Sequence, residues 1–248
     1  MRSRLIAVLG FLAMAGPVSA QVTVRSGSGA SPAAIAAVVD QFRTDLGGLR
    51  REINWDGVPA SFATPNAMPP NFFNVNSPRG VVLSTPGTSV HVSAGSSDPS
   101  GSPIEFGNFD PSYVNAFQSF SPQRLFSPVG SNIFDVQFFL PGTNVPAEVI
   151  GFGLVLTDVD VIGATTVRLF DANGTSIAVL GAPPLNQGLS FVGGFVGPLD
   201  PRIARVRVTL GNAVLGAFDN NAGIDVVVTD DFIYSEPTAR SLFNNGFE

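Results

Sequence analysis

The sequence predicts a mainly-β protein, an antiparallel β-sandwich preceded by one short N-terminal helix. Across residues 51–237, short β-rich segments alternate with clusters of Gly, Pro, Asn, Asp and Ser. A helical period of apolar residues occurs only before this region, at residues 32–46. No self-similarity at a fixed period is found, which argues against a solenoid. Many short strands in one region of this length are typical of a sandwich.

The first twenty residues have the layout of a secretory signal peptide. Arg2 and Arg4 precede an apolar run at 5–15, and small residues lead to Ala20. This run is shorter than the roughly 18–20 residues needed to cross a bilayer. We therefore expect cleavage near Ala20, a secreted, periplasmic or extracellular mature chain, and no membrane span within it.

Residues 21–50 combine a Ser/Gly-rich start, expected to be loose, with the one predicted helix. Ser31 is a good N-cap, Pro32 suits the first helical position, and Gly47 ends the run. A partner-binding or membrane-surface helix is the alternative, but a membrane-surface helix would carry a basic polar face. We expect the helix to pack on the domain that follows. Its apolar stripe is Ile35, Val38, Val39, Phe42, Leu46 and Leu49.

Alternating polar and apolar residues place the strands of the sandwich. Residues 203–210 show the pattern best, because Arg205 and Arg207 share one face and the Val residues share the other. Residues 171–174 (DANG) predict a hairpin turn, and residues 96–103 predict a loop. The sandwich is expected to span 51–237, with a polar tail at 238–248. The predicted strands are 52–55, 80–84, 89–93, 133–140, 148–158, 165–171, 175–180, 190–196, 203–210 and 224–234.

Composition excludes several functions. The chain has no Cys, no Lys and a single His among 248 residues, so thiol, Schiff-base and multi-histidine zinc chemistry are ruled out. Its formal net charge of −6 argues against nucleic acid as a partner, because binding phosphate backbones needs a cationic surface.

The pattern of residues also argues against an enzyme. His91 lies at 89–93 with the parity of two serines, which predicts a solvated strand histidine. No Gly-x-Ser-x-Gly elbow occurs in the chain, and its few Glu residues are scattered. We expect no catalytic residue and no required cofactor. A polysaccharide-directed hydrolase stays as an alternative, with Glu105 or Glu148 facing an Asp across a cleft.

Acidic residues near the C-terminus form a candidate calcium site. Ca²⁺ binds six to eight oxygen atoms, and carboxylates are gathered just before and within the last predicted strand. An acid near the first strand joins them if the first and last strands are neighbours. The candidate ligands are Asp56, Asp219, Asp225, Asp230 and Asp231.

A second, weaker pair consists of Asp158 and Asp160, which share a face at strand spacing. The alternative for all of these acids is that they cap turns and solubilise an apolar domain.

Aromatic residues offer two further alternatives. The Phe-rich stretch at 104–126 is either buried or an exposed interaction patch. Exposed Trp55, Tyr113 or Tyr234 would favour sugar binding, because flat rings with a polar group stack on sugar faces.

Five segments carry a family resemblance. They are 51–57 (REINWDG), 80–87 (GVVLSTPG), 151–160 (GFGLVLTDVD), 165–174 (TTVRLFDANG) and 229–234 (TDDFIY). In this order they resemble the jelly-roll-like extracellular domains of PEP-CTERM-type exported bacterial proteins, whose biochemical role is mostly undefined. The resemblance implies a jelly-roll-like sandwich. The chain departs from that group because it lacks the Pro-Glu-Pro anchor and ends in Gly-Phe-Glu.

Together these observations predict an exported, non-catalytic interaction module whose partner is a glycan or a cell-surface protein. A carbohydrate-binding module is the alternative within the binding class, and the hydrolase is the alternative outside it.

Overall fold

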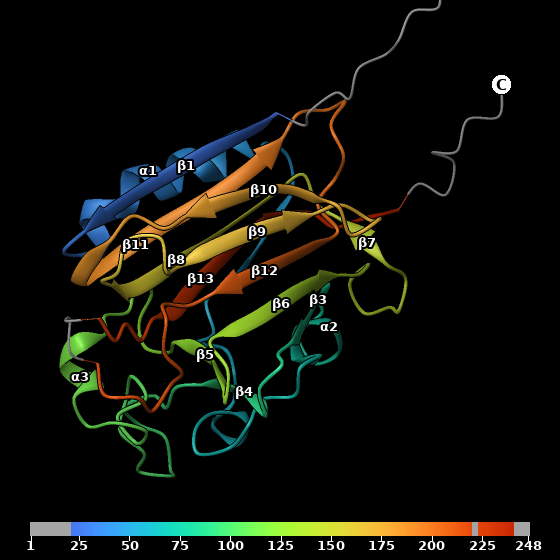
Figure 1. The fold of residues 1–248 in the computed structure, drawn as a ribbon. Coiled ribbons are helices and arrows are strands. Elements are labelled where there is room, and N and C mark those ends of the chain that lie inside the picture. Colours follow the sequence, from blue (N-terminus) through green and yellow to red (C-terminus); the bar gives the residue numbers. More distant parts are fainter. Residues whose placement is uncertain (1–20, 220–222, 241–248) are drawn as a thin grey trace, which may run out of the picture.

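The computed structural model describes residues 21–219 and 223–240, and the chain within these ranges is mainly β (Figure 1). The predicted signal peptide and most of the predicted C-terminal tail lie outside the described residues. Two antiparallel sheets pack together, and a helix covers the outer face of one of them, so the fold class agrees with the prediction. Within the described ranges, no helix is both long enough and apolar enough to span a membrane.

In the part of the chain that the structure describes, seven strands form the larger sheet and five form the smaller one. All of the strand pairs are antiparallel. The larger sheet runs β1 (Val22–Gly29), β11 (Leu185–Val196), β8 (Gly151–Val159), β13 (Val228–Ser235), β5 (Phe126–Val129) and β4 (Ser89–Val92), with β2 (Arg50–Ile53) also paired to β13. The smaller sheet runs β10 (Ser176–Gly181), β9 (Thr166–Phe170), β12 (Arg205–Thr209), β6 (Ile133–Phe138) and β3 (Val81–Ser84). A third, two-stranded sheet joins β14 (Thr238–Ala239) to β7 (Ala147–Glu148).

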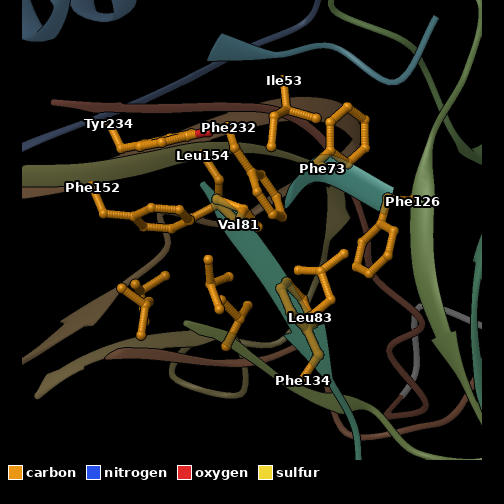
Figure 2. Close-up of a cluster of buried hydrophobic side chains, with 14 of the residues drawn as sticks. Ile53, Phe73, Val81, Leu83, Phe126, Phe134, Phe152, Leu154, Phe232 and Tyr234 are labelled. Carbon is orange, nitrogen blue, oxygen red and sulfur yellow. The ribbon is translucent and has the colours of Figure 1, made fainter. Parts of the chain in front are cut away.

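The main hydrophobic core lies between the two large sheets (Figure 2). Aromatic rings dominate it: Trp55 stacks on Phe126 with ring centroids 4.4 Å apart, and Phe232 meets Trp55 edge-on. Phe152 and Leu154 project into this core from β8 (Figure 2). Because the domain has no disulfide, burial of these rings and of the Val, Ile and Leu side chains around them is the main source of its stability.

Helix α1 (Pro32–Asp45) packs on the outer face of the larger sheet, against β1 and β11 (Figure 1). Phe42 lies over glycines of β8 and β11, where a Cβ on Gly153 or Gly193 would fall within 3 Å of its ring. The prediction that this helix packs on the domain is therefore confirmed. Leu49, assigned to the apolar stripe, lies beyond the end of the helix and is exposed.

Each of the ten predicted strands overlaps an observed one, with the segment 148–158 divided between β7 and β8. The hairpin is confirmed, since β9 and β10 pair across it and Gly174 has a φ of +81°. The prediction that residues 21–30 are loose is wrong, because they contain β1, which pairs with β11 along its whole length. The sequence pattern does not predict five short elements: η1 (Ala60–Phe62), α2 (Phe72–Val75), α3 (Tyr113–Ala116), β5 and β14.

Most aromatic rings of the Phe-rich stretch are buried. Phe106, Phe117 and Phe126 are almost fully inaccessible to solvent, and Phe109 is partly buried in the same cluster as Phe106. The same cluster contains Tyr113 of α3 together with Leu215 and Val226. Of the two alternatives, the structure therefore supports burial.

Candidate metal centre

Three carboxylates from two distant segments of the sequence meet at one end of the larger sheet. Asp158, Asp160 and Asp219 each place one carboxylate oxygen within 4.8 Å of the others. Asp225 contacts the same turn through its side chain. We refer to these four residues as the Asp158 cluster.

Asp158 stands at the end of β8, in a backbone conformation that is rare for a residue other than Gly. Its φ is +64°, and only 1% of its surface is exposed. One carboxylate oxygen, Oδ1, accepts a hydrogen bond of 2.7 Å from the backbone N–H of Gln187. The other oxygen, Oδ2, is buried and has no hydrogen-bond partner among the described residues. A buried carboxylate oxygen without a partner is costly, which suggests a ligand role.

Asp160 follows immediately after β8, and its carboxylate has fewer hydrogen-bond partners among the described residues than that of Asp158. Neither of its carboxylate oxygens has a hydrogen-bond partner among the described residues, although both are buried. Its backbone N–H donates to Oδ1 of Asp225 (3.2 Å), and the N–H of Val161 donates to Oδ2 of Asp225 (3.1 Å). Asp225 thus holds the turn that carries Asp160, while the side chain of Asp160 is left to face the cluster.

A second loop holds Asp225 and Asp219 in place. The carbonyl oxygen of Asp225 accepts from the backbone N–H groups of Asn212 and Ala213. Gly211 makes this close approach possible, because its φ is +51° and a Cβ there would lie 2.1 Å from that same oxygen. Asp219 Oδ2 accepts from the N–H of Val226 at 3.0 Å.

The electrostatics of the Asp158 cluster are those of mutual repulsion. Burial first, and then the charges of Asp160, Asp219 and Asp225, raise the pKa of Asp158 to about 7. The same causes, burial followed by Asp219 and Asp225, raise the pKa of Asp160 to about 6. All of the charges that act on these two groups are carboxylates. A bound cation would offset both the cost of burying their negative charges and the repulsion between them.

A second acidic group lies on β13 and is built differently. A bulge in the pairing of β13 with β8 falls at Asp230 and Asp231, which we call the Asp230 pair. Asp230 accepts from the N–H groups of Phe120 and Ser121, and the Ser121 hydroxyl lies 2.7 Å from Oδ1 of Asp231. Burial and the adjacent carboxyl raise the pKa of Asp230 well above its usual value. Donors from Phe120 and Ser121 therefore already occupy carboxylate oxygens of the Asp230 pair, which makes these oxygens less available to an ion.

The structure divides the sequence-based set of calcium ligands into three places. Asp219 and Asp225 join Asp158 and Asp160, the pair that the sequence ranked second. Asp230 and Asp231 bind the loop around Ser121. Asp56 has a third role: its Oδ1 accepts hydrogen bonds from the backbone N–H groups of Gln123 and Arg124. The expected neighbourhood of first and last predicted strands is nevertheless confirmed, since β2 pairs with β13.

The lone histidine is buried, so the prediction of a solvated side chain on a polar face is wrong. His91 is 8% exposed, and its ring meets Phe109 edge-on with centroids 5.9 Å apart. The loop before α3 covers the strand face that period-two alternation assigns to solvent. Nε2 lies 3.0 Å from the Ser89 hydroxyl, and burial lowers the pKa of the ring.

The residues named for sugar binding and hydrolysis are placed as follows. Trp55, Tyr113 and Tyr234 are all at most 1% exposed, so they form no stacking platform. Glu148 lies on β7, 3.8 Å from Arg240. Burial alone raises the pKa of Glu105 to about 7, without a contribution from a neighbouring carboxylate.

No family model matches the chain, and no curated protein matches it.

Proposed function

We propose that this protein is an exported, non-catalytic β-sandwich interaction module that binds Ca²⁺ at the Asp158 cluster. The resemblance of five segments to jelly-roll-like domains of PEP-CTERM-type exported proteins supports the assignment to the exported class. The signal-peptide pattern at 1–20 supports it independently.

One observation carries the metal proposal: three carboxylates each place an oxygen within 4.8 Å of the others, and buried oxygens of Asp158 and Asp160 have no hydrogen-bond partner among the described residues. In a folded domain, like charges held this close are unfavourable unless something compensates them. The backbone is arranged to keep them together, through Asp225 and the N–H groups that surround it. A cation would complete this arrangement.

The oxygen-only character of the cluster favours Ca²⁺. Carboxylate and carbonyl oxygens suit hard cations, whereas zinc and copper sites use Cys or His. Calcium tolerates the irregular geometry that a strand end and a long loop provide, whereas Mg²⁺ demands near-octahedral ligands. We infer that the ion ties the turn after β8 to the loop before β13.

Calcium titration by isothermal calorimetry tests the proposal. The wild-type chain should bind about one Ca²⁺ per molecule, and Asp160→Asn should weaken binding at least a hundredfold, since it removes one charge and one oxygen ligand. Asp40→Asn makes the same chemical change on the exposed face of α1 and should leave binding unchanged. Absence of binding to the wild-type chain at millimolar Ca²⁺ would refute the metal proposal.

A further inference from the structure

Strand β1 forms one edge of the larger sheet, and its outer side has no partner strand among the described residues (Figure 1). It pairs with β11 along its whole length without a register shift. No backbone hydrogen bond joins β1 to any other part of the chain that the structure describes. In an antiparallel edge strand, every second residue turns its N–H and C=O groups outward. β1 therefore presents a row of donors and acceptors at the spacing that another strand requires.

The strands at the other three ends of the two large sheets are protected, within the described ranges, in ways that β1 is not. Beside β4, the N–H of Met68 donates to the carbonyl oxygen of Val90 at 2.9 Å. Beside β3, the N–H of Leu83 donates to the carbonyl oxygen of Pro70, also at 2.9 Å. A bulge interrupts the pairing of β10 with β9 at the remaining edge. Soluble proteins cover or distort their edges in these ways to prevent strand addition. The regular, uncovered edge of β1 therefore indicates that a strand adds there.

The side chains along β1 let another strand approach. Val24, Ser26 and Ser28 lie on one face of the strand, and all three are exposed and uncharged. On the other face, Arg25 forms an ion pair of 2.7 Å with Asp45 of α1. The edge thus carries no uncompensated charge, although charged side chains are a common protection of edge strands.

We propose that β1 pairs with β1 of a second copy of this chain, antiparallel and about a two-fold axis, so that the two larger sheets join into one. Because the axis is perpendicular to the sheet, one residue of β1 must face its own copy. Two registers keep nearly all of β1 paired. One of them sets Arg25 against Arg25, which is an unfavourable pair of like charges. The other centres on Ser26 and sets Arg25 opposite Gly27 and Val24 opposite Ser28, so each larger side chain meets a small one.

Helix α1 leaves room for the second copy on the same face of the sheet. Because α1 packs over β1 and β11, the axes of the two helices would lie about 10 Å apart, a distance at which helices pack. Val38 and Asp45 lie over β1. Further round the helix, on the side away from β11, the side chains of Ala33, Ala37 and Thr44 are small and exposed. The second helix can therefore pack along this side and add apolar burial to the backbone pairing. β1 contributes no residue to the Asp158 cluster, so this pairing does not depend on calcium.

Size-exclusion chromatography with light scattering, run in EGTA, tests the inference. At about 50 μM the chain should have twice the mass of a single copy, and dilution should dissociate it. Ser26→Lys and Ser26→Asp should each weaken the dimer at least tenfold, because each sets like charges against each other across the axis. An equimolar mixture of the two variants should restore a dimer, because opposite charges then meet. That rescue also shows that both variants are folded.

Ser176→Lys is the matched control, because Ser176 is an exposed serine on the edge strand β10. This variant should dimerise as the wild type does. A wild-type chain that stays monomeric would overturn the inference, and so would a dimer that Ser26→Lys leaves intact or that Ser176→Lys disrupts. A mixture of the two Ser26 variants that stays monomeric would overturn it as well. Because all of these measurements are made in EGTA, their outcome is separate from that of the calcium titration.

Discussion

The two acidic groups of this domain, the Asp230 pair and the Asp158 cluster, both bury carboxylates but differ in the hydrogen-bond donors around them. In the Asp230 pair, the backbone of Phe120 and Ser121 and the Ser121 hydroxyl surround the carboxylates with hydrogen-bond donors. In the Asp158 cluster, three buried oxygens of Asp158 and Asp160 have no donor among the described residues. The fold thus supplies donors to the first group, whereas no donor among the described residues reaches those three oxygens of the second group. The density of Asp in the sequence does not distinguish the two, but the supply of donors does.

The largest effect is expected where the backbone holds the Asp158 cluster together. Gly211→Ala should destabilise the fold by about 3 kcal/mol, because the new Cβ meets the Asp225 carbonyl and the φ of +51° is unfavourable for Ala. Gly174→Ala is the matched control: its φ is also positive, but nothing lies within 4 Å of the added Cβ. It should cost only about 1 kcal/mol. Urea denaturation measures both, and equal losses would contradict the role assigned to Gly211.

Removing one charge from the Asp158 cluster should change stability in opposite directions with and without calcium. In EGTA at pH 8, Asp158→Asn should stabilise the fold by about 2 kcal/mol. The raised pKa of Asp158 shows that its ionised form is unfavourable there, and partial hydration of the site reduces the full effect. In Ca²⁺ the wild type should gain stability and the variant should not. Thermal melts of both proteins in the two buffers measure the difference, and a variant less stable than wild type in EGTA would be evidence against the repulsion described here.

Removing a donor from the Asp230 pair should lower the free energy of unfolding by an amount that does not depend on calcium. Ser121→Ala removes the hydroxyl that lies between the two carboxyl groups, so we expect a loss of about 1–2 kcal/mol from unsatisfied buried acceptors. This loss should be the same in Ca²⁺ and in EGTA, as measured by urea denaturation. A loss that calcium reverses would place an ion at Asp230 and Asp231 instead.

A further effect concerns the pH dependence of the Asp230 pair. The folded-state pKa of Asp230 lies above its usual value of 3.8, so the stability it contributes is complete below pH 3.8 and is lost as pH rises through the folded-state pKa. Asp230→Asn removes this proton equilibrium while keeping an oxygen for the two N–H donors. Between pH 5 and pH 8 the variant should therefore lose less stability than wild type. If urea denaturation gave the same change in stability with pH for both proteins, the raised folded-state pKa of Asp230 would be contradicted.

The strands and the helix could be predicted because their periodicity reflects burial on one face. In β12, Val206 and Val208 are buried while Arg205 and Arg207 are not, as the alternation requires. β1 was missed because its Ser and Gly residues resemble a flexible segment. Glycine is instead required in β1 by close packing against α1, because a Cβ on Gly29 would lie 2.5 Å from the Cβ of Ala34.

The candidate site could be predicted only in part. Asp158 and Asp160 stand out as a pair at strand spacing, but nothing local places Asp219, some sixty residues later in the chain, beside them. That contact depends on the loop between β12 and β13, whose path Gly211 and Asn212 fix. The burial of His91 could not be predicted for a related reason: Phe109, which packs against its ring, belongs to a segment that is distant from β4 in the sequence.

The most direct test of the proposed calcium site is a thermal melt of the chain in 1 mM Ca²⁺ and in EGTA. An ion that binds the folded state at a hundred times its dissociation constant adds about 2.7 kcal/mol, which for a domain of this size corresponds to a rise in Tm of about 5–10 °C. We predict that rise for wild type and for Asp40→Asn, and none for Asp160→Asn. A wild-type Tm that is the same in both buffers would contradict the assignment of the Asp158 cluster as a calcium site.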